Sequence, residues 1–221
     1  MFIGHFGVAM ASKRVAPRVS LPVLFLATAF ADTLWPFLVA AGIETVRIAP
    51  GDTKYTPLEF VSYPWSHSLL MLIIWGAIFG TIYRLYTGDG RGGAVLGGLV
   101  VSHWVLDWVT HRADMPLYPG GPKFGLALWN HPNASMAIEV VIFAIGVAIY
   151  EGTTKGKDKK GQYSFWFMVL VFLVAFVAGN APPPSVRVLW VGAIIGVAVG
   201  LLLSAYVDRH RTLEDSVVPV S

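Results

Sequence analysis

Residues 92–111 read GGAVLGGLVVSHWVLDWVTH, an apolar run interrupted near its end by two histidines and an aspartate. A helix needs about 20 mostly apolar residues to cross a hydrocarbon layer of about 30 Å. The run meets that length, whereas ionisable side chains inside it are costly unless they are paired, hydrated or bound to a metal. The run therefore predicts a transmembrane helix that carries part of a functional site.

The rest of the chain has a similar, membrane-like composition. Of its 221 residues, 55% are hydrophobic and 13% are charged, and the mean hydropathy is +0.63, which excludes an ordinary soluble domain. We expect an all-α, polytopic integral membrane protein with about six transmembrane helices. The expected spans are 18–42, 65–86, 92–111, 133–150, 163–180 and 185–207.

Breaks in composition divide the chain into four expected parts. These are a helical membrane core with the metal site (1–150), a basic cytoplasmic loop (151–162), a two-helix packing hairpin (163–207) and a cytoplasmic tail (208–221). Within the core, Met1–Ser12 is apolar but too short to cross the membrane, so we expect a re-entrant half-helix. In the hairpin, glycines at four-residue spacing predict close helix packing: Gly192, Gly196 and Gly200.

Charge sets the expected orientation. If both termini are cytoplasmic, one side of the membrane holds five of the 16 lysines and arginines and the cytoplasmic side holds the others, which agrees with the positive-inside rule. The five are Arg47, Lys54, Arg112, Lys123 and Arg187. Loop placement also explains the net charge of +3 without nucleic acid. We expect a bacterial inner-membrane protein whose site opens toward the periplasmic side, under turn-rich, ordered loops at 42–64 and 112–132.

The ionisable residues of the expected spans gather in the first two-thirds of the chain. Because cysteine is absent, a metal would be held by histidine, carboxylates and water. The candidates are Asp32, His67, His103, Asp107, His111 and Glu139, with His5 added if the half-helix dips into the bilayer. A packing stripe satisfied by hydrogen bonds is the structural alternative, but clustering on several spans favours a metal site.

The span quoted above gives the clearest local geometry. His103, Asp107 and His111 are four residues apart, so they share one helix face, and the two histidines lie about 12 Å apart along the axis. The histidines are too far apart to bind one ion easily. Asp107 between them could bridge two ions about 3.5 to 4 Å apart.

Further residues are candidates for catalysis and substrate binding. Glu139 could be a metal ligand, a general base or a hydrogen-bond acceptor of a ligand histidine, and Asp107 and His111 are the other candidate catalytic residues. Arg112 and Lys123 could hold a phosphate, although Arg112 could equally be a snorkelling interface residue. Ser68, next to His67, is the third candidate for substrate binding.

The order and spacing of these residues over roughly 1–150 resemble the YdjM-like family, described as LexA-binding, inner-membrane-associated hydrolases. The resemblance is carried by Gly4-His5, Asp32, Ser66-His67-Ser68, His103-x3-Asp107 with His111, and the loop from Pro116-Leu117 to Trp129. That family is distantly similar to zinc-dependent phospholipases C and single-strand nucleases. The resemblance implies phosphoester hydrolysis, with His5, Asp32, His67, His103, Asp107 and His111 as metal ligands. Ser135-x3-Glu139 stands where the family has HxxxE, so we expect one or two ions rather than three.

The leading hypothesis is a membrane-embedded, zinc-type hydrolase that cleaves a phosphoester of a lipid or amphiphile. A metal- or proton-coupled transporter is the alternative from another class, and a metal-stabilised scaffold or regulatory protein is a third. An amidase resembling alkaline ceramidases is the alternative within enzymes, because a metal-activated water can cleave either bond.

Overall fold

The computed structural model describes residues 1–179 and 181–214, and these are mostly helical. The helices are α1 (Ile3–Ser12), α2 (Leu21–Thr28), α3 (Phe30–Ala40), α4 (Pro64–His67), α5 (Leu69–Thr87), α6 (Gly90–Thr110), α7 (Pro132–Glu151), α8 (Lys159–Ala178) and α9 (Val186–Arg209), with the 3-10 turn η1 (Leu128–Asn130) before α7. The strands are β1 (Thr45–Ile48), β2 (Leu58–Ser62), β3 (Met115–Pro116), β4 (Lys123–Phe124), β5 (Thr154–Gly156) and β6 (Arg211–Leu213). The described residues are mostly helical, in agreement with the expected all-α class, and the short strands are an addition that was not expected. The expected tail (208–221) is described only to residue 214.

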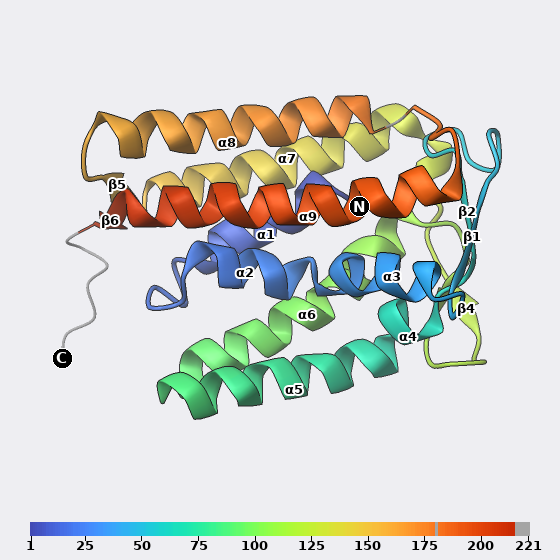
Figure 1. Cartoon of the computed structure of the whole chain (residues 1–221), viewed down its shortest axis with the longest axis horizontal. Helices are drawn as coiled ribbons and strands as arrows, with labels where there is room; N and C mark the ends of the chain where they lie inside the picture. Colours follow the sequence, from blue (N-terminus) through green and yellow to red (C-terminus); the bar gives the residue numbers. More distant parts are fainter. Residues whose placement is uncertain (180, 215–221) are drawn as a thin grey trace.

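The long helices lie side by side along the long axis of the molecule (Figure 1). Five of the described helices, α5 to α9, are long and apolar enough to cross a membrane, and the number rises to six if α2 and α3 form one broken span. The break lies at Ala29, where the two helices meet at 58°. All six expected spans therefore match helices, and the first is bent rather than continuous.

Glycine allows close packing at two helix pairs. A Cβ on Gly76 of α5 would lie 2.6 Å from the carbonyl oxygen of Gly97 on α6, and a Cβ on Gly7 of α1 would lie 2.6 Å from that of Ile142 on α7. The half-helix α1 is thus held against α7, the neighbour with which it makes its most extensive contact. The same packing role predicted for the α9 glycines is wrong for Gly192 and Gly196, because nothing lies within 4 Å of a Cβ built there.

Short strand pairs close both ends of the helices. At one end β1 pairs antiparallel with β2, with Val46 opposite Phe60 and a bulge before Val46, and β3 pairs with β4. These pairs order the two loops that were expected to be turn-rich. At the other end β5 pairs with β6 (Figure 1), so part of the expected loop 151–162 is ordered.

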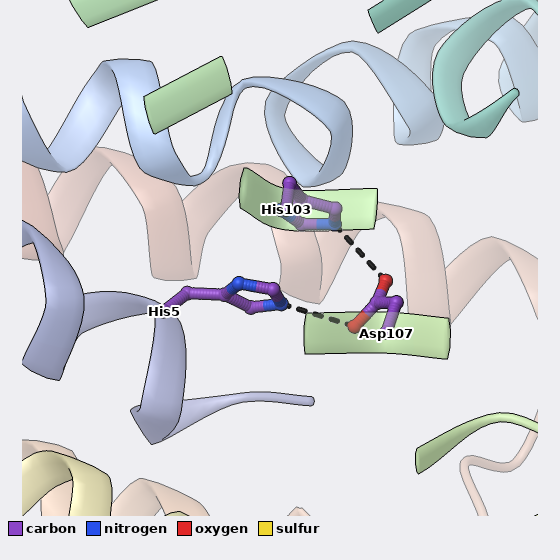
Figure 2. Close-up of side chains that lie close together, drawn as sticks. All are labelled: His5, His103 and Asp107. Carbon is purple, nitrogen blue, oxygen red and sulfur yellow. Dashed lines mark hydrogen bonds and ion pairs between the residues drawn. The ribbon is translucent and has the colours of Figure 1, made fainter. Parts of the chain in front are cut away.

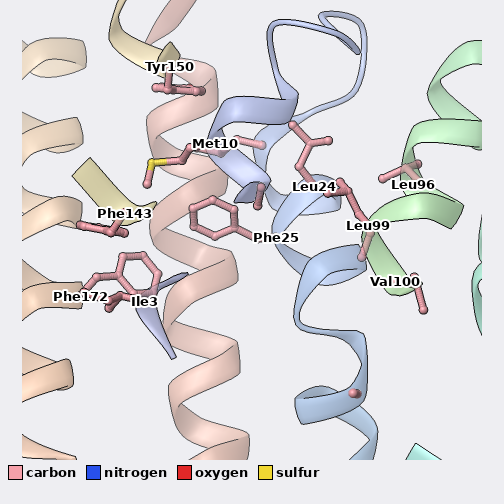
Figure 3. Close-up of a cluster of buried hydrophobic side chains, with 14 of the residues drawn as sticks. Ile3, Met10, Leu24, Phe25, Leu96, Leu99, Val100, Phe143, Tyr150 and Phe172 are labelled. Carbon is pink, nitrogen blue, oxygen red and sulfur yellow. The ribbon is translucent and has the colours of Figure 1, made fainter. Parts of the chain in front are cut away.

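The hydrophobic core lies between α1, α2, α6, α7 and α8. Its larger buried side chains include Met10, Phe25, Leu96, Phe143 and Phe172 (Figure 3). In contrast, Ile82 and Leu85 of α5 and Leu202 of α9 are 62%, 80% and 72% exposed. Aliphatic side chains at this exposure suit contact with lipid rather than water. The outer helices therefore present apolar faces while α1 and α6 carry polar groups in the interior.

Candidate metal centre

The Asp107 carboxylate on α6 is the centre of a buried cluster. Its Oδ2 lies 3.1 Å from His103 Nε2, 3.7 Å from His111 Nε2 and 4.0 Å from His67 Nε2. Its Oδ1 lies 3.1 Å from His5 Nε2. Figure 2 shows the rings of His5 and His103 one above the other, each joined by a dashed line to a different oxygen of Asp107. Side chains from α1, α4, α6 and the end of α6 thus direct Nε2 atoms at one carboxylate.

Asp32 on α3 forms the second side of the cluster. Its Oδ1 lies 3.5 Å from His67 Nε2 and 3.8 Å from His103 Nε2. Two groups could each hold a metal ion: His5 with His103 and Asp107, and His67 with Asp32 and His103. His103 belongs to both groups, and its ring stacks on that of His5 with centroids 3.9 Å apart. The six residues predicted as metal ligands are therefore brought together.

Three of the histidines have their other ring nitrogen, Nδ1, engaged by a fixed partner. His103 Nδ1 lies 2.9 Å from the Thr28 carbonyl oxygen, and His111 Nδ1 lies 3.1 Å from the Asp114 carboxylate. Both partners are acceptors, so Nδ1 carries the proton. His67 Nδ1 lies 2.7 Å from Ser66 Oγ.

The Ser66 hydroxyl fixes the tautomer of His67 in the same way. Its single hydrogen is donated to Glu44 Oε2 at 2.6 Å, and Glu44 Oε1 also accepts from the Ser66 and Trp65 backbone amides. Ser66 Oγ must therefore accept from His67 Nδ1. In the neutral form of each of these three rings the lone pair is then on Nε2 and points into the cluster.

Inside the cluster, the Nε2 lone pairs of these histidines consequently face carboxylate oxygens, which are also hydrogen-bond acceptors. His103 Nε2 is buried 3.1 Å from a carboxylate oxygen and has no hydrogen-bond partner among the described residues. Lone pairs in such a place are unfavourable unless a proton or metal ion lies between them. Tetrahedral zinc holds nitrogen and oxygen ligands at about 2.0–2.2 Å, which separates the ligand atoms by about 3.3 Å. The Nε2-to-Oδ2 distances of 3.1 and 3.7 Å at His103 and His111 bracket that separation.

The loop after α6 supports His111. Burial raises the pKa of the Tyr63 hydroxyl well above its ordinary value, and the nearby Asp114 carboxylate raises it further, so Tyr63 donates to Asp114 at 2.8 Å. Burial alone would raise the pKa of Asp114, but hydrogen bonds from His111, Tyr63 and Arg112 outweigh it and hold that pKa below its ordinary value. Asp114 and Tyr63 thereby hold the His111 ring in place through its Nδ1 atom.

Sequence reasoning missed the supporting residues Glu44, Ser66 and Asp114 as functional groups. Glu44 and Asp114 lie in the loops beside the spans and are nevertheless 2% and 5% exposed. A carboxylate next to a candidate ligand, as in His111-x2-Asp114, was a usable signal. The pairing of Glu44 with Ser66, 22 residues apart, had no local signal.

Glu139 on α7 lies beside the cluster but in neither metal-binding group. Its Oε2 accepts from the Phe2 amide at 2.6 Å and more weakly from the Gly4 amide at 3.4 Å, which holds the start of α1 in place. The Met1 amino group in turn donates to Asp107 Oδ1 at 2.5 Å and to Thr110 Oγ1 at 3.2 Å. Glu139 thereby positions the segment that carries His5.

The three predicted substrate-binding residues do not join this cluster. Arg112 pairs with three carboxylates, those of Asp52, Glu59 and Asp114. Lys123 Nζ donates to the Val61 carbonyl at 3.2 Å. Ser68 is the N-cap of α5, and its Oγ accepts from the Met71 amide. The structure gives these three side chains roles in ordering the loops and helix start.

Comparison with known proteins gives one result. The family model described as YdjM inner membrane protein matches residues 3–182, a range that includes all of the cluster residues. Neither the curated proteins nor the solved structures provided a match. The family match covers most of the chain and agrees with its apolar helices. The chain therefore belongs to the YdjM family of inner membrane proteins.

Proposed function

We propose that this protein is a membrane-embedded, metal-dependent hydrolase, with zinc as the favoured metal. The observation that carries the proposal is the orientation of His67, His103 and His111. Each has its Nδ1 engaged by Ser66, Thr28 or Asp114 and its Nε2 directed at buried carboxylates. Ligand histidines in zinc sites are held by partners of this kind. The two ligand groups share His103, whose one free lone pair on Nε2 can bind a single ion. A second ion would therefore depend on the other histidines and on the carboxylates of Asp32 and Asp107.

The roles of the residues follow from their positions. Asp107 and Asp32 would supply carboxylate ligands, and His5, His67, His103 and His111 would supply imidazole nitrogen ligands. A bound divalent ion would lower the pKa of water toward neutrality and stabilise negative charge on a phosphoryl oxygen.

Glu139 is suited to hold or move a proton next to that centre. Its side chain is buried, and it lines a cavity of about 220 Å³ together with Tyr55, Phe60 and Trp129. A carboxylate on the wall of a cavity can accept a proton from water and return it to a leaving group. Asp32, on the opposite side of the cluster, is 43% exposed and keeps the site open there.

The proposed reaction class is hydrolysis of a phosphoester in a lipid or other amphiphile. The membrane location supports an amphiphilic substrate, and the resemblance of the sequence to zinc phospholipases favours a phosphoester. Amide hydrolysis is the competing reaction, because the same activated water serves both. A broad panel of lipid phosphates, phosphodiesters and ceramides, tested on one preparation, separates the two.

Metal content per chain tests the proposal first. The wild type, purified in detergent without chelator or nickel, is compared with Asp107→Ala and His103→Ala. His131→Ala is the matched control, because His131 is exposed and lies outside the cluster. We expect one or two zinc ions in the wild type and the control and loss in both cluster variants. A monodisperse wild type that binds no zinc even when supplied with it would refute the proposal and favour a proton-coupled transporter.

A further inference from the structure

A second, larger cavity adjoins the cluster at Asp32. It encloses about 440 Å³, within the range of about 300–1,000 Å³ found for small-molecule sites. Its walls come from the N-terminal residues, α1, α2, α3, α8 and α9 and are mainly aromatic, aliphatic and glycine residues. Asp32 is the one ionisable side chain on these walls in the described part of the chain.

The α9 wall of this cavity explains the glycines whose packing role was wrong. Gly192 and Gly196 line the cavity, and a Cβ at either position would meet only open space. Gly200 is in ordinary contact, 3.5 Å from the Phe172 ring. A larger residue at Gly192 or Gly196 would thus extend into the cavity without displacing protein atoms.

Asp32 belongs both to the candidate metal centre and to the wall of the larger cavity. Asp32 Oδ1 faces His67 and His103, while the same side chain is 43% exposed and forms part of the cavity wall. The cavity and the smaller one beside Glu139 share Phe2 and Ala175 on their walls. The two cavities are therefore neighbours. The larger one is mainly apolar and has Asp32 on its wall, and the smaller one has Glu139 on its wall.

We propose that the larger cavity binds one hydrocarbon chain of an amphiphilic substrate, with the bond to be cleaved near Asp32 and the polar part directed to the Glu139 cavity. The proposal rests on the proposed hydrolase function. An apolar wall with a single carboxylate at one end matches a molecule that is apolar except at one end. Gly192 and Gly196 leave the space for that chain and so select its width.

Photocrosslinking tests the chain site directly. The probe is a phosphatidic acid with a diazirine in one acyl chain, added to protein in dodecyl maltoside micelles, and crosslinked peptides are mapped by mass spectrometry. We expect saturable crosslinks on cavity-lining peptides of α8 and α9. Gly196→Leu should reduce them at least tenfold. Gly98→Leu is the matched control, because Gly98 is also an exposed helical glycine with open space around it but lies on α6.

Two outcomes would overturn the chain site: cavity crosslinks that never saturate with probe, and equal cavity crosslinking in Gly196→Leu and Gly98→Leu. Saturation is measured on the wild type, so the test holds even if Gly196→Leu fails to fold. Metal content is measured on the same samples. His103→Ala should lose metal and keep the crosslinks. In the wild type, bound metal without cavity crosslinks refutes the chain site alone, whereas cavity crosslinks without bound metal refute the hydrolase alone.

Discussion

Ser66→Ala should weaken zinc binding although Ser66 is not itself a predicted ligand. The serine hydroxyl accepts from His67 Nδ1 at 2.7 Å and donates to Glu44 at 2.6 Å. Without it, His67 loses the acceptor that keeps the proton on Nδ1 and the lone pair on Nε2. The variant retains the backbone bonds from Ser66 and Trp65 to Glu44, so the local turn should persist.

The size of the effect follows from these contacts. Loss of a hydrogen-bond partner of a ligating histidine lowers metal affinity by about 10–100-fold, which equals about 1.4–2.7 kcal/mol. Competition with a fluorescent zinc chelator measures the dissociation constant. Ser102→Ala is the control: Ser102 also precedes a cluster histidine, but its hydroxyl bonds to Leu99 O of its own helix. If both variants bind zinc within twofold of the wild type, the argument from the Nδ1 partners is refuted.

Four further results are expected. Gly76→Leu should lower stability by about 1–3 kcal/mol through overpacking against α6, seen as a lower thermal midpoint than Gly98→Leu, and equal midpoints would contradict that packing. Arg211→Ala should remove the 2.6 Å bond to Glu151 and lower stability by about 2–3 kcal/mol while leaving metal content unchanged, as thermal melting and metal analysis would show. Glu139→Gln should keep the metal and lower turnover by about 100-fold or more; loss of metal would make Glu139 a ligand instead. Zinc at 100 times its dissociation constant should stabilise chelator-treated protein by about 2.7 kcal/mol, and an unchanged melting midpoint would argue against a site in the folded state.

Much of the fold was accessible from sequence because membrane spans depend on length and apolarity. All six expected spans match helices to within a few residues. The bend at Ala29 was not expected, since no proline or glycine marks that position. The meaning of glycine spacing was also misjudged for α9: spacing gives a shared face, but only the neighbouring helices decide whether that face is packed or open.

The members of the site were predictable, whereas their support was not. Asp32, His67 and Asp107 are conspicuous because an ionisable group in an apolar helix is costly. Glu44 and the Thr28 carbonyl lie outside or at the end of helices, where polar groups are ordinary and give no signal. Asp114 is different, because its spacing from His111 was a usable signal. Only the folded chain shows that Glu44 and the Thr28 carbonyl reach the histidines. Arg112 is the opposite case. Its charge suggested that it binds a substrate phosphate, but in the folded chain it pairs with three carboxylates of the protein itself.

The placement of α1 has a consequence for the order of assembly. The helix is made first, is too short to cross the membrane, and finds its partners far along the chain: His5 contacts Asp107 across 102 residues, and Phe2 contacts Glu139 across 137. At a synthesis rate of about 5–20 residues per second, the second interval lasts about 7–27 s. Asp107 is made before the end of that interval, but Glu139 is made only at its end, so the start of α1 can be fixed in its final position only after α7 has emerged.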